Sequence, residues 1–220
     1  MDLLRQFIDF FLHIDDQLLM IADQYGTLTY AILFLIIFCE TGLVITPFLP
    51  GDSLLFAVGA LSAREDSPLN VFFVFALLTI AAILGDTVNY FIGRFFGQKV
   101  LALNLPFVKQ EYIMRTNHFY EKHGGKTIIL ARFMPIVRTF APFVAGVGNM
   151  DYSRFFLFNV VGGVLWVALF VFAGFLFGNI PFIQENFEWV AVIIVLLSVL
   201  PMVYEWLKSR RERTSAVVGD

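Results

Sequence analysis

One stretch of the chain, residues 40–61, combines a membrane-like apolar run with residues that a straight helix cannot accommodate. It reads ETGLVITPFLPGDSLLFAVGAL. Pro47, Pro50 and Gly51 cannot continue a regular helix. Inside a bilayer, irregular backbone is tolerated only where protein or a water-filled cavity satisfies its freed N–H and C=O groups. The stretch therefore predicts a re-entrant hairpin that lines a cavity.

Two acidic residues flank this turn. Glu40 and Asp52 are the only charged residues between positions 28 and 61. At the centre of a bilayer each carboxylate would cost roughly 2.5 to 3.5 kcal/mol, so an acid in this place is by default a functional residue. We expect Glu40 and Asp52 to face the cavity, with Pro50 and Gly51 supporting the turn between them.

The composition excludes an ordinary soluble domain. Hydrophobic residues make up 59% of the chain and charged residues only 15%, which predicts an integral membrane protein. The first long apolar run begins near residue 28, too far along for a signal peptide, so the N-terminus is expected to be retained. Since Cys39 is the single cysteine, we expect no disulfide, no metal site and no cofactor. Nothing in the sequence predicts nucleic-acid binding.

The apolar segments predict an all-α fold with about four transmembrane helices. Full-length spans are expected at 71–92, 155–177 and 187–207. Residues 28–61 are long enough for one membrane crossing followed by the re-entrant hairpin. Residues 1–24 place apolar side chains near helical spacing and predict an amphipathic helix in the membrane interface. Packing of that helix on the rest of the protein is the alternative.

Basic residues predict the orientation. They gather in a surface segment, residues 98–126, and in the tail, residues 208–220. The positive-inside rule puts both on the cytoplasmic side, so an even number of crossings must separate them. Because two spans already do so, residues 127–150 are expected to enter and leave on one side, as a second re-entrant hairpin. Counting back places the N-terminus in the cytoplasm as well.

A weak internal repeat divides this chain, which we predict to be one domain of 220 residues, into halves at 28–97 and 127–178. A shift of 81 residues pairs Gly93 with Gly174. The two spans are expected to point in opposite directions, so that the hairpins form an inverted repeat. Paired broken segments in inverted halves point to the midplane site of a transporter, which favours transport over a purely structural role.

The motifs below carry a family resemblance and cover nearly the whole chain. They are Glu40-Thr41-Gly42, Pro47-Phe48-Leu49-Pro50-Gly51-Asp52-Ser53-Leu54-Leu55, Gly85-Asp86 with Tyr90, Gly93-Arg94 and Gly97, Arg132-Phe133-Met134-Pro135-Ile136-Val137-Arg138, Ala145-Gly146, Phe155 with Asn159, and Trp166 with Gly174 and Gly178. On these motifs the chain resembles the DedA family of bacterial membrane proteins, which is related to the eukaryotic VTT-domain lipid scramblases. One departure is Asp52, which stands where many members have Glu.

The resemblance implies a flippase that returns undecaprenyl phosphate, a polyprenyl phosphate carrier lipid, across the bacterial cytoplasmic (inner) membrane for reuse in envelope synthesis. Family members have also been tied to membrane potential, alkaline tolerance and resistance to cationic compounds. A proton-dependent cation or drug antiporter is therefore the alternative. For an intramembrane enzyme the sequence offers no metal-ligand cluster and no His beside the membrane acids, so we do not expect the protein to be an enzyme.

Two arginines are the candidate phosphate ligands. Arg132 and Arg138 are the only charges between positions 127 and 150, and the planar guanidinium bonds phosphate oxygens in two places while remaining charged. Pro135 is expected to support the break between them. The alternative is that these arginines neutralise Glu40 and Asp52 in buried ion pairs. The two readings are compatible if phosphate competes for the arginine.

That competition would couple binding to a proton, and we hypothesise that Glu40, Asp52 or both carry it. Asp86 and Asn89 lie one turn apart on a span and are expected to support the same cavity, through a polar contact to a hairpin backbone rather than through substrate. The adjacent Gly162 and Gly163 permit close helix contact, either inside one chain or in a homodimer.

Overall fold

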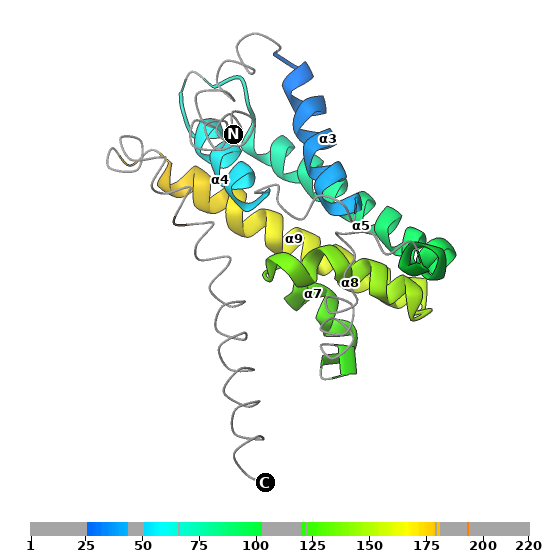
Figure 1. Ribbon diagram of the computed structural model, residues 1–220. Helices are drawn as coiled ribbons and strands as arrows, with labels where there is room; N and C mark the ends of the chain where they lie inside the picture. The colour runs from blue at the N-terminus through cyan, green and yellow to red at the C-terminus, as the bar shows by residue number, and fades with distance from the viewer. Residues whose placement is uncertain are drawn as a thin grey trace, which may run out of the picture.

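The computed structural model describes residues 26–43, 51–65, 67–102, 120–121, 123–178, 180 and 193, and every regular element in these ranges is helical (Figure 1). The predicted interfacial helix at 1–24, most of the 98–126 surface segment, the span at 187–207 and the tail at 208–220 lie outside the described residues. So do Pro47 and Pro50 of the first turn.

The helices are, in chain order, α3 (Leu28–Gly42), α4 (Gly51–Ser62), α5 (Val71–Ala102), the 3-10 turn η1 (Gly124–Lys126), α7 (Thr127–Ala131), α8 (Pro135–Val147) and α9 (Tyr152–Phe177). Their starts follow from local sequence. The Asn70 side chain accepts hydrogen bonds from the first backbone N–H groups of α5, and Asp151 caps α9 by accepting from the N–H of Arg154 at 3.1 Å. Pro135 opens α8, where its missing N–H costs no helical hydrogen bond.

Two helices in the described ranges are long and apolar enough to cross a membrane. They cover Val71–Gly97 and Tyr152–Phe177, which have 27 and 26 residues, against the roughly 20 that a bilayer core requires. They run in opposite directions (Figure 1), as the inverted repeat predicts. With 15 and 12 residues, α3 and α4 are shorter, so the expectation of about four spans is met only in part.

The second broken segment has the predicted interruption. The helix α7 stops at Ala131, residues 132–134 form a bend, and α8 begins at Pro135. Pro142 does not interrupt α8, which continues through this proline. Packing of α8 along α5 holds the helix together across the one hydrogen bond that proline removes.

Glycines join each hairpin helix to the span of the other half. A methyl group at Gly93 of α5 would overlap the carbonyl oxygen of Phe143 in α8, and one at Gly174 of α9 would overlap that of Phe56 in α4. Gly93 and Gly174 are the pair related by the shift of 81 residues. The repeat seen in the sequence therefore corresponds to two equivalent helix contacts.

The reciprocal contacts obey the same relation. Gly146 of α8 faces the carbonyl oxygen of Tyr90, and Gly59 of α4 faces that of Val171; Tyr90 and Val171 are again 81 residues apart. A helix backbone approaches another this closely only where the facing residue, here a glycine, has no side chain. Two pseudo-symmetric seams, α5 with α8 and α9 with α4, thus hold the hairpin helices in place.

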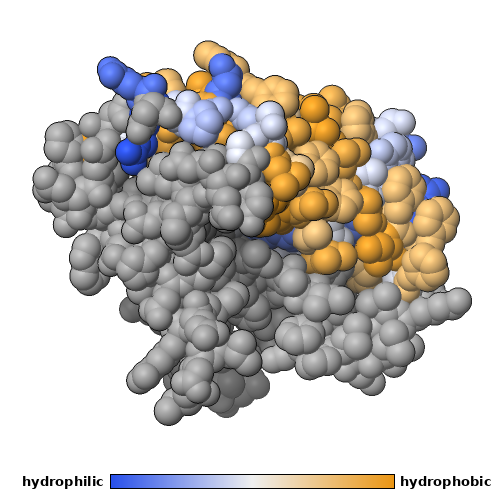
Figure 2. All heavy atoms as spheres, turned by 90° about the horizontal axis from the view of Figure 1, so that it is seen from above, coloured by the Kyte–Doolittle hydropathy of each residue, from blue (hydrophilic) through white to orange (hydrophobic). Residues whose placement is uncertain are grey.

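Apolar side chains cover the outside of the two long helices. Those on α5 and α9 that are at least half exposed are Phe72, Phe73, Ile80, Phe95, Phe96, Leu157, Leu165, Leu169, Leu176 and Phe177. Figure 2 shows one face on which hydrophobic surface is continuous, with hydrophilic residues towards its margins. A surface of this kind is suited to contact with lipid tails or with other helices.

We predict that Gly174→Ala and Gly93→Ala each cost about 1 to 3 kcal/mol of stability, because the added methyl group must push a helix backbone away. The measurement is thermal unfolding of the purified protein in detergent. Gly148→Ala is the matched control, since a methyl group there would meet no neighbouring helix, only the carbonyl oxygens of Val144 at 3.2 Å and Ala145 at 3.9 Å in α8 itself. Equal unfolding temperatures for all three variants would contradict the two-seam description.

Candidate functional site

Arg138 is the centre of a buried ionic cluster. From α8 its Nη1 donates to Asp52 Oδ1 at 2.9 Å, and its Nη2 pairs with Glu40 Oε1. Glu40 lies in the last turn of α3, and Asp52 lies in the first turn of α4. One guanidinium group therefore joins α8 to the end of α3 and to the start of α4.

Glu40 also joins the end of α3 to the start of α4. The N–H of Gly51, the first residue of α4, donates to Glu40 Oε1 at 3.2 Å. A Cβ atom at Gly51 would overlap the Glu40 carboxylate, so only glycine allows this approach. The positive end of the α4 dipole and Arg138 thus act on the same carboxylate.

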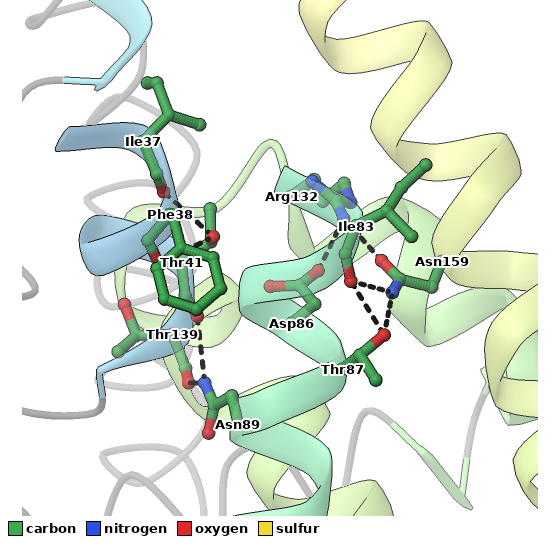
Figure 3. Close-up of polar contacts among 10 residues, drawn as sticks. All are labelled: Ile37, Phe38, Thr41, Ile83, Asp86, Thr87, Asn89, Arg132, Thr139 and Asn159. Atoms are coloured by element: carbon green, nitrogen blue, oxygen red, sulfur yellow. Dashed lines mark hydrogen bonds and ion pairs between the residues drawn. The ribbon is translucent and has the colours of Figure 1, made fainter. Parts of the chain in front are cut away.

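Arg132 forms a second ionic cluster. Its Nη2 donates to Asp86 Oδ2 at 2.5 Å and to Asn159 Oδ1 at 2.6 Å. Asn159 in turn donates to the backbone oxygen of Ile83 at 3.0 Å. In Figure 3 these side chains point towards one another from α5, α9 and the bend that follows α7. The cluster ties the start of the second hairpin to both long helices.

Asn89 joins three helices one turn further along α5. Its amide nitrogen donates to the backbone oxygen of Thr41 at 3.2 Å and to that of Thr139 at 2.9 Å (Figure 3). Thr41 lies on α3 and Thr139 on α8. The expected polar contact between Asn89 and a hairpin backbone is therefore present.

Both clusters border one small cavity, lined by Glu40, Thr41, Asp86, Arg132, Arg138, Thr139 and Trp166. Buried polar atoms normally find a hydrogen-bond partner. Within the described ranges Glu40 Oε2 and Arg132 Nε have none. The cavity wall thus holds an acceptor and a donor with unused bonding capacity, one in each cluster.

The structure divides the predicted site residues between the two clusters. Arg138 pairs with both Glu40 and Asp52, as the ion-pair alternative has it, whereas Arg132 pairs with Asp86 instead. Asp86 therefore bonds a side chain and not the hairpin backbone that we expected. Pro135 begins α8, and Pro50 lies outside the described residues.

Sequence reasoning missed two members of the site, Asn159 and Trp166. Both lie on α9, which we treated from the sequence simply as an apolar span. Their signal was available: an amide in the middle of a span, and an indole far from the interface where tryptophan usually gathers. The close contact that Gly162 permits is internal, with Ile129 and Arg132.

The fold and this cavity define a helical protein with long lipid-compatible helices around a buried ionic centre. The VTT-domain family matches residues 49–176. The chain is 55% identical over 217 residues to Protein DedA of Escherichia coli strain K12, a match that covers 98% of this chain and 99% of that protein. It is 35% identical over 205 residues to Inner membrane protein YqjA of the same strain, covering 93% and 92%.

An uncharacterized membrane protein of Mycobacterium tuberculosis strain H37Rv is 40% identical over 197 residues, with 89% of this chain and 86% of that protein covered. No solved structure gives a significant match. The family match spans more than half of the chain, and the relatives match almost end to end. The chain is therefore a membrane protein of the DedA family, whose characteristic unit is the VTT domain.

We predict that Asp86→Ala destabilises the protein by about 3 to 5 kcal/mol, because it leaves the Arg132 charge buried without its carboxylate. The double variant Asp86→Ala/Arg132→Ala should recover most of this loss, since neither charge remains. Thermal unfolding in detergent of both variants and of Arg132→Ala gives the comparison. Additive losses in the double variant would show that the pair is not the unit that holds this part of the fold.

Proposed function

We propose that this protein is a flippase for lipid phosphates, and that its substrate is undecaprenyl phosphate, returned across the bacterial inner membrane. The observation that carries the proposal is the largely buried guanidinium of Arg138, whose side chain is 15% exposed and whose two terminal nitrogens each hold a carboxylate from a different helix. Carboxylate and phosphate oxygens bind this planar group in the same way. The two acids therefore occupy the place that a phosphate headgroup requires.

Charge explains why the headgroup needs such a place. A phosphate cannot cross hydrocarbon unpaired, because a charge without a partner in a low-dielectric medium costs many kcal/mol. A cavity between helices can pair the headgroup while the polyprenyl tail stays in lipid. The cavity is small with its ion pairs intact, so we propose that Arg138 releases Glu40 and Asp52 as the phosphate enters. Arg132 and the N-terminus of α4 supply further positive character.

Releasing the acids has an electrostatic consequence. Glu40 and Asp52 are buried, and two carboxylates that lose their shared cation cannot both stay charged at little cost. We propose that one or both take up a proton while phosphate holds Arg138 and give it back when Arg138 returns. Lipid movement is then coupled to protons. The lipid itself is moved without chemical change, so the protein is not an enzyme.

A second candidate function is a proton-dependent cation or drug antiporter, and one observation favours it. The two clusters hold three acids, Glu40, Asp52 and Asp86, against two arginines. An excess of buried negative charge suits a cation. The two candidate functions differ in which residues bind the substrate. The arginines would bind a phosphate, and the acids would bind a cation.

We predict that Arg138→Ala abolishes translocation of a fluorescent polyprenyl phosphate in liposomes, and that Arg138→Lys lowers the rate roughly tenfold or more. Lysine keeps the charge but loses the two-pronged contact. Proton flux, followed with a pH-sensitive dye in the same liposomes, should suffer less from the lysine variant than lipid movement does. Val88→Ala, on the exposed side of α5, is the control.

Wild-type protein that moves protons and cations but no lipid phosphate, with or without a pH gradient, would favour the antiporter. Equal loss of proton flux and lipid movement in Arg138→Lys would also count against a phosphate role for this arginine.

We predict that Glu40→Gln and Asp52→Asn remove the pH dependence of lipid translocation. Each amide keeps the shape of the side chain but cannot exchange a proton. The measurement is the initial translocation rate across a range of pH, with each variant compared with the wild type. Two variants that transport with the wild-type pH profile would exclude these acids as proton carriers.

A further inference from the structure

Trp166 occupies an unusual position for a tryptophan in a membrane helix. It lies inside α9, far from either end, and it is only 2% exposed. Its indole Nε1 donates to Asp52 Oδ1 at 2.9 Å, the same oxygen that accepts from Arg138 Nη1. Because an indole can donate one hydrogen bond and accept none, a carboxylate is a fitting partner for it in this buried place.

The ring of Trp166 also meets both arginines. The guanidinium carbon of Arg132 lies 5.8 Å from the ring centroid and that of Arg138 lies 5.6 Å from it. Both distances fall within the range of about 6 Å over which an aromatic face attracts a cation. Arg132 and Arg138 bond different acids, so this one ring connects the two ionic clusters.

The chemistry of the indole differs from that of every other partner of Arg138 described above. Glu40 and Asp52 are anions that compete with a phosphate and change charge when they bind a proton. The indole is neutral at any relevant pH, and its negative ring face attracts guanidinium groups without occupying their N–H donors. It can therefore stay in contact with the arginines after the carboxylates leave.

We propose that Trp166 is a positioning residue for the phosphate headgroup of the substrate. Its ring keeps Arg132 and Arg138 together at the cavity, and its N–H holds Asp52 in place after a phosphate group has taken Arg138. The ligand it serves is a phosphate monoester on a lipid tail. This inference rests on the proposed lipid-phosphate function and adds to it a residue that carries no charge.

The test compares binding of a short-chain polyprenyl phosphate with binding of the corresponding polyprenol to the purified protein in detergent. Trp166→Leu should weaken phosphate-lipid binding on the order of tenfold, because both the ring face and the N–H are lost. Trp166→Phe keeps a ring and should lose only part of the affinity. Polyprenol binding should not change in either variant, since it involves no phosphate.

Phe155→Leu is the matched control, because it removes a fully buried aromatic ring from α9 that stacks on Tyr90 instead of on an arginine. If Trp166→Leu acted only by disturbing the packing, it would lower the binding of polyprenyl phosphate and polyprenol alike. Phe155→Leu would then lower the binding of both lipids in the same way. Inorganic phosphate, added as a competitor, shows whether the headgroup alone suffices for the site or the tail is needed.

A spectroscopic measurement reads the same contact directly. The chain has three tryptophans, so Trp189→Phe/Trp206→Phe leaves Trp166 as the only one. Its emission should change as polyprenyl phosphate is added, over the concentration range in which the lipid binds, and should not change with polyprenol. Arg138→Ala in this background should abolish the response.

The outcomes separate the inference from the function on which it rests. Wild-type protein that prefers the phosphate lipid, with Trp166→Leu showing the same preference, would overturn the role of Trp166 and leave the proposed function standing. Unchanged Trp166 emission on phosphate-lipid binding would overturn it too. Wild-type protein that binds both lipids equally would contradict the proposed function, and the inference would fall with it.

Discussion

The whole site depends on one constraint: a guanidinium group buried among apolar helices must have anions at its N–H donors. Arg138 meets this requirement with Glu40 and Asp52, which come from the end of α3 and the start of α4. Removing either kind of charge alone leaves the other unpaired at high cost. The same requirement makes the centre sensitive to other anions. Any oxyanion that binds Arg138 takes a cation away from Glu40 and Asp52, which must then bind protons or find other partners.

The position of this centre follows from the two glycine seams. Gly146 and Gly93 hold α8 against α5, while Gly59 and Gly174 hold α4 against α9. Each hairpin helix is thus packed on the span of the opposite half. The ionic contacts of Arg138 then cross between the hairpins instead of closing within one of them. A change of partner at Arg138 consequently acts on the contact between the two halves of the molecule.

Much of this arrangement could be predicted from single residues. Pro135 marked the interruption between α7 and α8, and charges inside apolar runs marked Glu40, Arg132 and Arg138. The choice of partners could not be predicted, because Arg132 is 46 residues from Asp86 and only packing decides which of three acids lies beside it. Trp166 stands among the family motifs but received no role in the site, because an aromatic residue in an apolar span looks like lipid-facing surface until its partners are known.

The proposed mechanism has one central claim: phosphate replaces carboxylates at Arg138, and the displaced acids take up protons. The most direct measurement is calorimetry of polyprenyl phosphate binding in buffers of different ionisation enthalpy, which counts the protons exchanged. The account predicts net proton uptake on binding, reduced in Glu40→Gln or in Asp52→Asn. If the wild type binds the phosphate lipid without taking up protons, the account is contradicted, because Glu40 and Asp52 would then have stayed charged and paired with Arg138.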